Sequence, residues 1–169
     1  MASEVDAFCT EYFGYAKILG VHYRGTDKGS EAPILPYDQV IRNINFHLEK
    51  YPETGGVFIS NDDDNFINYI CGGSINRPII YRNDSFRSEN KIAIHQAIQD
   101  KMDINRDAIV NCLLLSRCHA LMKTASILSA WSKLFNPKLP LIILSQPYNN
   151  CRWFPERELV KDVLYPAIG

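Results

Sequence analysis

The chain has 169 residues, of which 46% are hydrophobic and 22% charged, values typical of a soluble globular domain with a sizeable core. Its formal net charge of −1 excludes a general electrostatic affinity for nucleic acid, so any phosphate chemistry must come from a local cluster. The five cysteines are an odd number without a Cys-x-x-Cys pair, which argues against a disulfide framework and a zinc site.

The sequence shows no signal that directs it into or across a membrane. No stretch approaches the roughly 18 apolar residues of a membrane-spanning helix, so we predict no membrane span. The N-terminus lacks a basic segment followed by a long apolar core, which is the pattern of a signal peptide. We therefore expect a cytoplasmic protein.

Strand and helix patterns alternate along the chain. After a leading helix over residues 1–16, the pattern predicts strands over 17–21, 57–60, 78–81, 119–124 and 140–144. Predicted helices cover 36–50, the segment between 64 and 72, 92–98, 108–118 with a cap at 105–107, 126–135, and 156–165 within a C-terminal extension over 150–169. Alternation with short connections predicts a single α/β domain over 1–169, with three α/β/α layers and a mainly parallel sheet.

The densest group of polar residues follows the first predicted strand, where open α/β sheets bind their ligands. His22 and Arg24 are alternate residues and should project in the same direction. Arg24 offers a planar, permanently charged group suited to a pyrophosphate. Gly25 lets the backbone approach a ligand closely, and Thr26 can donate a hydrogen bond. The alternative is that Arg24 forms a salt bridge with Asp27 that only holds the turn together.

Three further groups have both a chemical and a structural interpretation. Glu31, in a flexible loop, can serve as a general base for a hydroxyl or be a solvated surface charge. The Asp-rich run at 61–64 suits a divalent cation or a ligand hydroxyl, or caps the helix that follows. Ser126 and Ser129 open a helix whose first turn suits phosphate oxygens, or they cap and pack that helix.

Three segments of the chain, taken together, resemble the α-1,6-fucosyltransferase and NodZ-like family. They are GVHYRGTDK at 20–28, VFISNDD at 57–63, and IVNCLLLSRC at 109–118 with the serines that follow. The similarity extends over roughly residues 16–135. It implies one half of a GT-B architecture, a Rossmann-like domain that binds the nucleotide sugar.

The resemblance implies a metal-independent, inverting transfer of fucose or a related sugar from GDP-fucose to a glycan hydroxyl, without a cofactor. Arg24 would bind the β-phosphate and stabilise the departing GDP, and Glu31 matches the acidic residue that deprotonates the acceptor. The candidate donor-binding residues are His22, Arg24, Thr26, Asp27, Lys28, Asp62, Asp63, Asn111, Ser126 and Ser129.

The chain departs from the family pattern at three places. Gly25 stands where the family often has a second arginine, and the loop before Glu31 is one residue shorter. Asn111 stands where an aspartate would pair with guanine, which leaves the identity of the base open. The expected partners are a nucleotide-sugar donor, a glycan acceptor, and an acceptor domain or partner chain.

A second interpretation is a domain that binds a nucleotide sugar without catalysing transfer. An unrelated dinucleotide-dependent enzyme is disfavoured, because no Gly-x-Gly-x-x-Gly follows the first strand.

Overall fold

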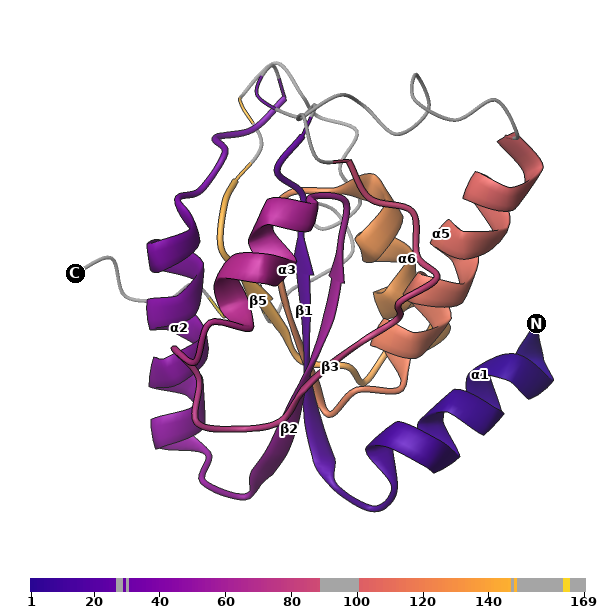
Figure 1. The fold of residues 1–169 in the computed structure, drawn as a ribbon, viewed down its shortest axis with the longest axis horizontal. Coiled ribbons are helices and arrows are strands. Elements are labelled where there is room, and N and C mark those ends of the chain that lie inside the picture. The colour runs from indigo at the N-terminus through magenta and orange to yellow at the C-terminus, as the bar shows by residue number, and fades with distance from the viewer. Residues whose placement is uncertain (27–28, 30, 89–100, 147, 149–162, 165–169) are drawn as a thin grey trace.

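The computed structural model describes residues 1–26, 29, 31–88, 101–146, 148 and 163–164. Among these residues, six strands form one parallel sheet in the order β3-β2-β1-β4-β5-β6 (Figure 1). The architecture is the predicted Rossmann-like α/β fold. The strands are β1 (Lys17–Tyr23), β2 (Thr54–Asn61), β3 (Ile79–Tyr81), β4 (Ala120–Lys123), β5 (Leu141–Ile143) and β6 (Val163–Leu164).

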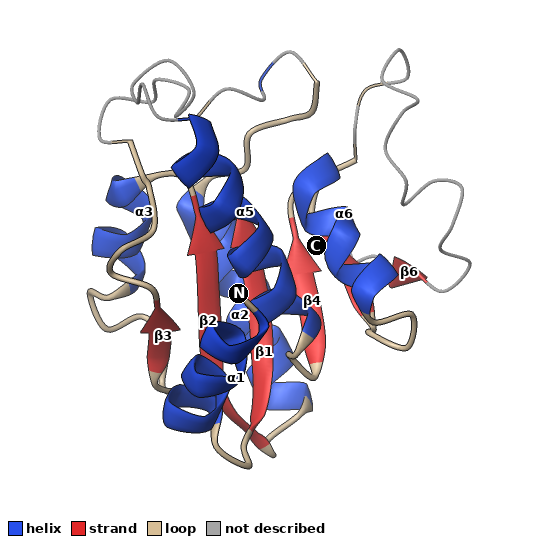
Figure 2. Cartoon of the chain, turned by 90° about the vertical axis from the view of Figure 1, so that its right-hand side faces the viewer, coloured by secondary structure: helices blue, strands red, loops and turns tan. Residues whose placement is uncertain are grey.

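Helices cover both faces of the sheet. Figures 1 and 2 show α2 and α3 on one side of the sheet and α1, α5 and α6 on the other. These helices are α1 (Ala2–Phe8), which continues as the π-helical η1 (Cys9–Phe13), α2 (Tyr37–Lys50), α3 (Asp64–Ile70), α5 (Lys101–Ser116) and α6 (Ile127–Phe135). None of the helices in the described part of the chain is long and apolar enough to cross a membrane.

Alternate side chains of β1 supply both halves of the core. Leu19 and Val21 pack with the buried residues of α2 and α3, whereas Ile18 packs with those of α1 and α5. A Cβ on Gly20 would lie 2.9 Å from the Cys118 Sγ atom, so β1 approaches the α5–β4 connection as closely as it does because residue 20 is glycine. Both faces of the central strand are thus fixed by packing.

The order of the strands places a topological switch beside β1. The chain goes from β1 to β2 and β3 on one side, and then returns to β4 on the other side of β1. In open parallel sheets, ligands bind beyond the carboxyl ends of the strands at this kind of reversal. The polar residues that follow β1 therefore lie at the position where a ligand is expected.

Two predicted element boundaries are wrong. Helix α5 begins no later than Lys101, so residues 105–107 lie inside the helix and do not cap it. Strand β2 begins at Thr54 and not at residue 57 as predicted, so Gly55 and Gly56 belong to the strand. A Cβ on Gly55 would lie 2.9 Å from the Ala16 Cβ atom, which explains glycine inside this strand.

The C-terminal extension is not helical where the structure describes it. Val163–Leu164 forms β6, which pairs in parallel with β5, so the helix predicted over 156–165 is wrong at these two residues. The other residues of that predicted helix, and the helix predicted over 92–98, lie outside the described residues.

Candidate functional site

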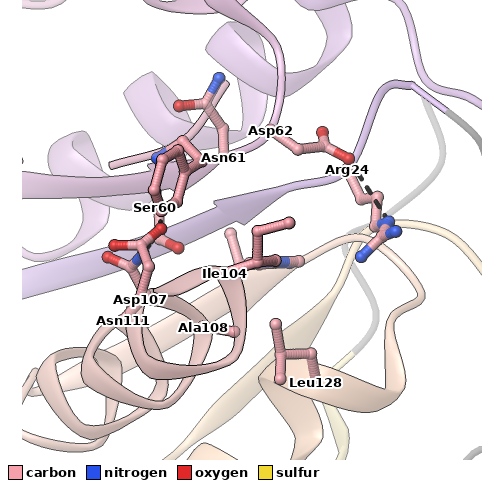
Figure 3. Close-up of a pocket in the computed structure, with 11 residues that line it drawn as sticks. Arg24, Ser60, Asn61, Asp62, Ile104, Asp107, Ala108, Asn111 and Leu128 are labelled. Atoms are coloured by element: carbon pink, nitrogen blue, oxygen red, sulfur yellow. Dashed lines mark hydrogen bonds and ion pairs between the residues drawn. The ribbon is translucent and has the colours of Figure 1, made fainter. Parts of the chain in front are cut away.

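A pocket opens beyond the carboxyl ends of β1 and β2, and α5 and the first turn of α6 close its other side. Figure 3 shows Arg24 and Asp62 at one end of this pocket and Asp107 and Asn111 at the other, with Ile104 between them. The sequence-predicted residues His22, Arg24, Asp62 and Asn111 thus converge on one site. The full lining comprises His22, Arg24, Ser60, Asn61, Asp62, Phe86, Ile104, Asp107, Ala108, Asn111 and Leu128.

The Asp62 carboxylate organises the loop that follows β1. Its Oδ1 atom accepts a hydrogen bond from the Gly25 backbone N–H at 3.0 Å, and its Oδ2 atom accepts one from the Thr26 hydroxyl at 2.6 Å. The Arg24 Nε atom lies 3.4 Å from the same Oδ2. Arg24 therefore forms an ion pair with Asp62, whereas the predicted alternative, a salt bridge with Asp27, is not tested. Asp27 lies outside the described residues.

Gly25 is required by the packing of Tyr23. A Cβ at position 25 would lie 2.5 Å from the Tyr23 Cε1 atom. The Tyr23 ring cannot easily move, because it stacks on Phe66 at 4.3 Å and its hydroxyl donates to the Leu35 carbonyl at 2.9 Å. A buried aromatic side chain thus excludes any larger residue, a second arginine included, from this position of the loop.

Asp63 caps a helix, so for this residue the structural interpretation of the acidic run holds. Its side chain accepts a hydrogen bond from the Asn65 N–H at 3.1 Å at the start of α3, and another from the Tyr37 hydroxyl at 2.6 Å. Asp63 is fully buried and does not line the pocket. Within the described ranges, no group of three or more His, Cys, Asp or Glu side chains is arranged to hold a metal ion.

The pocket residue His22 lies beside a second buried base, Lys123. His22 on β1 is in register with Lys123 on β4, and the Lys123 Nζ atom donates to the Ser126 carbonyl at 2.9 Å. Burial lowers the pKa of Lys123 to about 7. Burial, together with the charges of Lys123 and Arg24, lowers the pKa of His22 well below its usual value. The His22 Nδ1 atom is buried without a hydrogen-bond partner among the residues that the structure describes.

The lowered pKa of Lys123 contributes a term to the folding stability that rises with pH. Between about pH 7 and pH 9 the unfolded chain keeps a proton on Lys123 that the folded chain has lost, so deprotonation favours folding by up to about 1.4 kcal/mol per pH unit. Urea denaturation across this range measures the total slope, to which the buried thiols of Cys112 and Cys118, with raised pKa values, contribute with the opposite sign. In Lys123→Met the slope should be smaller by that amount. An identical slope in both proteins would contradict a lowered pKa for Lys123.

A hydrogen-bond network forms the wall of the pocket opposite Arg24. The Asp107 carboxylate accepts from the Asn111 Nδ2 atom at 3.3 Å, the Phe86 N–H at 3.3 Å and the Ser85 hydroxyl at 3.2 Å. Its Oδ1 atom also lies 2.6 Å from an Arg82 nitrogen. Burial raises the pKa of Asp107, and the positive charge of Arg82 opposes that shift. The Asp107 carboxylate is thus bound by groups of the protein itself, and its contacts fix the position of this wall.

Comparison with known proteins supports a fold and no closer relationship. No protein-family model matches the sequence, and a search of curated proteins returns no match either. NodZ α-1,6-fucosyltransferase co-crystallised with GDP matches with a TM-score of 0.54 and 17% identity, over 87% of this chain and 46% of that one. NodZ soaked with GDP-fucose gives 0.52 and 18%, over 87% and 47%. Fucosyltransferase NodZ from Bradyrhizobium gives 0.53 and 18%, over 88% and 46%.

The chain shares the fold of these fucosyltransferase structures. The resemblance seen in the sequence motifs is confirmed at that level. The chain spans about half the length of the solved structures that it matches.

The other predicted site residues lie outside the described lining of the pocket. Ser126 and Ser129 are buried at the start of α6, where the Ser129 hydroxyl donates to the Ser126 carbonyl at 3.3 Å. The Glu31 carbonyl accepts a hydrogen bond from the Tyr148 N–H at 2.8 Å. Lys28, like Asp27, falls outside the described residues. Thr26 contributes through its bond to the pocket residue Asp62 described above.

Sequence reasoning missed part of the lining, notably Asp107, Phe86 and Ile104. Asp107 has a recognisable signal, since it precedes Asn111 by four residues and so shares its face of the helix. Phe86 follows β3 in an irregular loop, where no periodicity indicates its direction.

Proposed function

We propose that this chain is the donor-binding domain of a glycosyltransferase that transfers fucose or a related sugar from a nucleoside diphosphate sugar, GDP-fucose first among them. One observation carries the proposal: Arg24, His22 and Asp62 all line one pocket, which lies at the topological switch of the sheet, and Asp62 pairs with Arg24 there. The NodZ structures of the same fold, one co-crystallised with GDP and one soaked with GDP-fucose, support this choice of ligand.

In this function, the chemistry requires stabilisation of negative charge on the departing diphosphate. Arg24 supplies a permanent positive charge at one end of the pocket, and its ion pair with Asp62 holds the guanidinium in place before the ligand arrives. A fixed cation can replace a metal ion in this role, so we propose a metal-independent transfer. Glu31 is the proposed general base for the acceptor hydroxyl, with inversion at the transferred carbon.

The acceptor requires surfaces beyond those of this pocket. Because the chain spans about half of the structures it matches, we propose that a second domain, in the same protein or in a partner, binds the acceptor glycan. The alternative is a domain that binds the nucleotide sugar without turnover. Incubation with GDP-fucose separates the two, because an active site releases free fucose slowly by hydrolysis and a binding domain leaves the donor intact.

The test of the proposal is calorimetric titration of the purified chain with GDP, GDP-fucose, UDP and ADP, with a chelator present. We expect GDP and GDP-fucose to bind and the other two nucleotides to bind more weakly. If another nucleotide bound more tightly than GDP, the donor-binding role of the pocket would stand and the GDP assignment would be wrong. Equal or absent binding of all four would overturn the proposal.

A further inference from the structure

Arg82 joins three segments of the chain through its buried guanidinium. The residue is only 6% exposed. Its nitrogens lie 2.6 Å from an Asp107 oxygen on α5, 2.8 Å from an Asp84 oxygen in the loop after β3, and 3.8 Å from a Glu4 oxygen on α1. A planar cation with several donors suits this arrangement, whereas a lysine provides a single charged centre.

The contacts of Asp107 extend this ion-pair cluster to the pocket. Arg82 neutralises the carboxylate, and that carboxylate in turn accepts hydrogen bonds from the Phe86 N–H and the Asn111 side chain. Phe86, Asp107 and Asn111 all line the pocket. Because buried networks of this kind stabilise one arrangement of their members, displacement of the Arg82 guanidinium should loosen the whole wall.

Glu4 provides the connection to the N-terminal helix. Its carboxylate approaches Arg82 and also lies 2.7 Å from an Arg106 nitrogen on α5, so it is held between two cations. We infer that Arg82 is a positioning residue for the pocket wall formed by Phe86, Asp107 and Asn111, and that Glu4 couples helix α1 to this wall. The effect on ligand affinity rests on the function proposed above, whereas the coupling itself does not.

The geometry of the pocket distinguishes this role from a general loss of stability. Arg24, the residue suited to a diphosphate, lies at the end of the pocket opposite Asp107 and Asn111 (Figure 3). A ligand with its phosphates at Arg24 extends its nucleoside toward the wall that Arg82 holds. Loosening that wall should lower the affinity for a nucleoside diphosphate and leave the affinity for inorganic pyrophosphate unchanged.

The test uses two charge-neutralising substitutions on the same helix. Glu4→Gln weakens the contact with Arg82. Asp6→Asn is the matched control, because Asp6 also pairs with an arginine, Arg117 in the turn directly after α5, at 2.9 Å, whereas the described ion pairs of Arg82 are with Glu4, Asp84 and Asp107. We expect Glu4→Gln to reduce GDP affinity by about fivefold with pyrophosphate affinity unchanged, and Asp6→Asn to change neither. Arg82→Ala is less informative, since it would leave Asp107 buried beside no cation.

Hydrogen exchange provides a second measurement that requires no ligand. The Phe86 N–H donates to Asp107, so its exchange should accelerate in Glu4→Gln and stay unchanged in Asp6→Asn. Equal effects of the two substitutions, or no effect of Glu4→Gln on this amide, would overturn the inference. Accelerated exchange in a chain that binds no nucleotide would uphold the coupling and count against the proposed function alone.

Discussion

Replacing Arg24 by alanine is expected to weaken GDP binding by about 100-fold while the protein remains folded. The loss should be this large because a partly buried guanidinium forms charge-assisted hydrogen bonds to a diphosphate that water cannot replace inside a pocket. Its side chain is 22% exposed, so it is accessible to a ligand and still shielded from bulk solvent. Titration calorimetry with GDP and with inorganic pyrophosphate measures the effect, and both ligands should be affected.

Arg42→Ala is the matched control for this substitution. Arg42 is an exposed residue of α2 outside the pocket lining, so its removal changes the net charge equally without touching the site. Affinity should be unchanged in this control. Arg24→Lys should recover only part of the binding, because an ammonium cannot form two parallel hydrogen bonds to phosphate oxygens. GDP affinity in Arg24→Ala equal to that of the unmodified chain would rule out Arg24 as the phosphate-binding residue.

The central part of the fold is predictable because its signals are local. Short apolar runs followed by polar residues mark β1 and β2, and the alternation with helices implies a parallel sheet. The rule that ligands bind at the carboxyl ends of such strands then brings His22 and Arg24 close to Asp62 without knowledge of any contact.

The errors arise where packing overrides local preference. Residues 105–107 are predicted to cap a helix, yet they lie inside α5, where the Asp107 carboxylate pairs with Arg82 and does not cap the helix. On α6 the large side chain of Trp131 is 49% exposed, whereas the helix packs through small residues such as Ser132, whose hydroxyl donates to the Cys112 carbonyl. Helical periodicity in hydrophobicity cannot identify a face built from serine and alanine.

The roles of the acidic residues depend on contacts between distant segments. Asp62 and Asp63 are adjacent and chemically identical, but one holds the loop after β1 and the other caps α3. Their directions follow from the end of β2, where successive side chains point to opposite sides. Sequence alone leaves open which of the two faces the pocket, and so it cannot separate a ligand-binding role from a structural one.

Asp62→Ala is expected to lower the free energy of unfolding by about 2–3 kcal/mol and to weaken GDP binding at the same time. The substitution removes the acceptor of the Gly25 N–H and the Thr26 hydroxyl, both buried, and the carboxylate that pairs with Arg24. Urea denaturation and calorimetry measure the two effects. Asp64→Ala, in the first turn of α3, is the control and should cost less than about 1 kcal/mol.

The combination with Arg24→Ala shows how Asp62 acts. If its carboxylate works by holding Arg24, Asp62→Ala should weaken GDP binding far less in the Arg24→Ala background than in the unmodified chain. If Asp62→Ala lowered GDP affinity equally in both backgrounds and left the free energy of unfolding unchanged, Asp62 would instead be a direct ligand contact. In that case Asp62 would bind the ligand directly, while Asp63 would still cap α3. Loop ordering through Asp62 therefore predicts a stability loss that a purely ligand-binding carboxylate would not show.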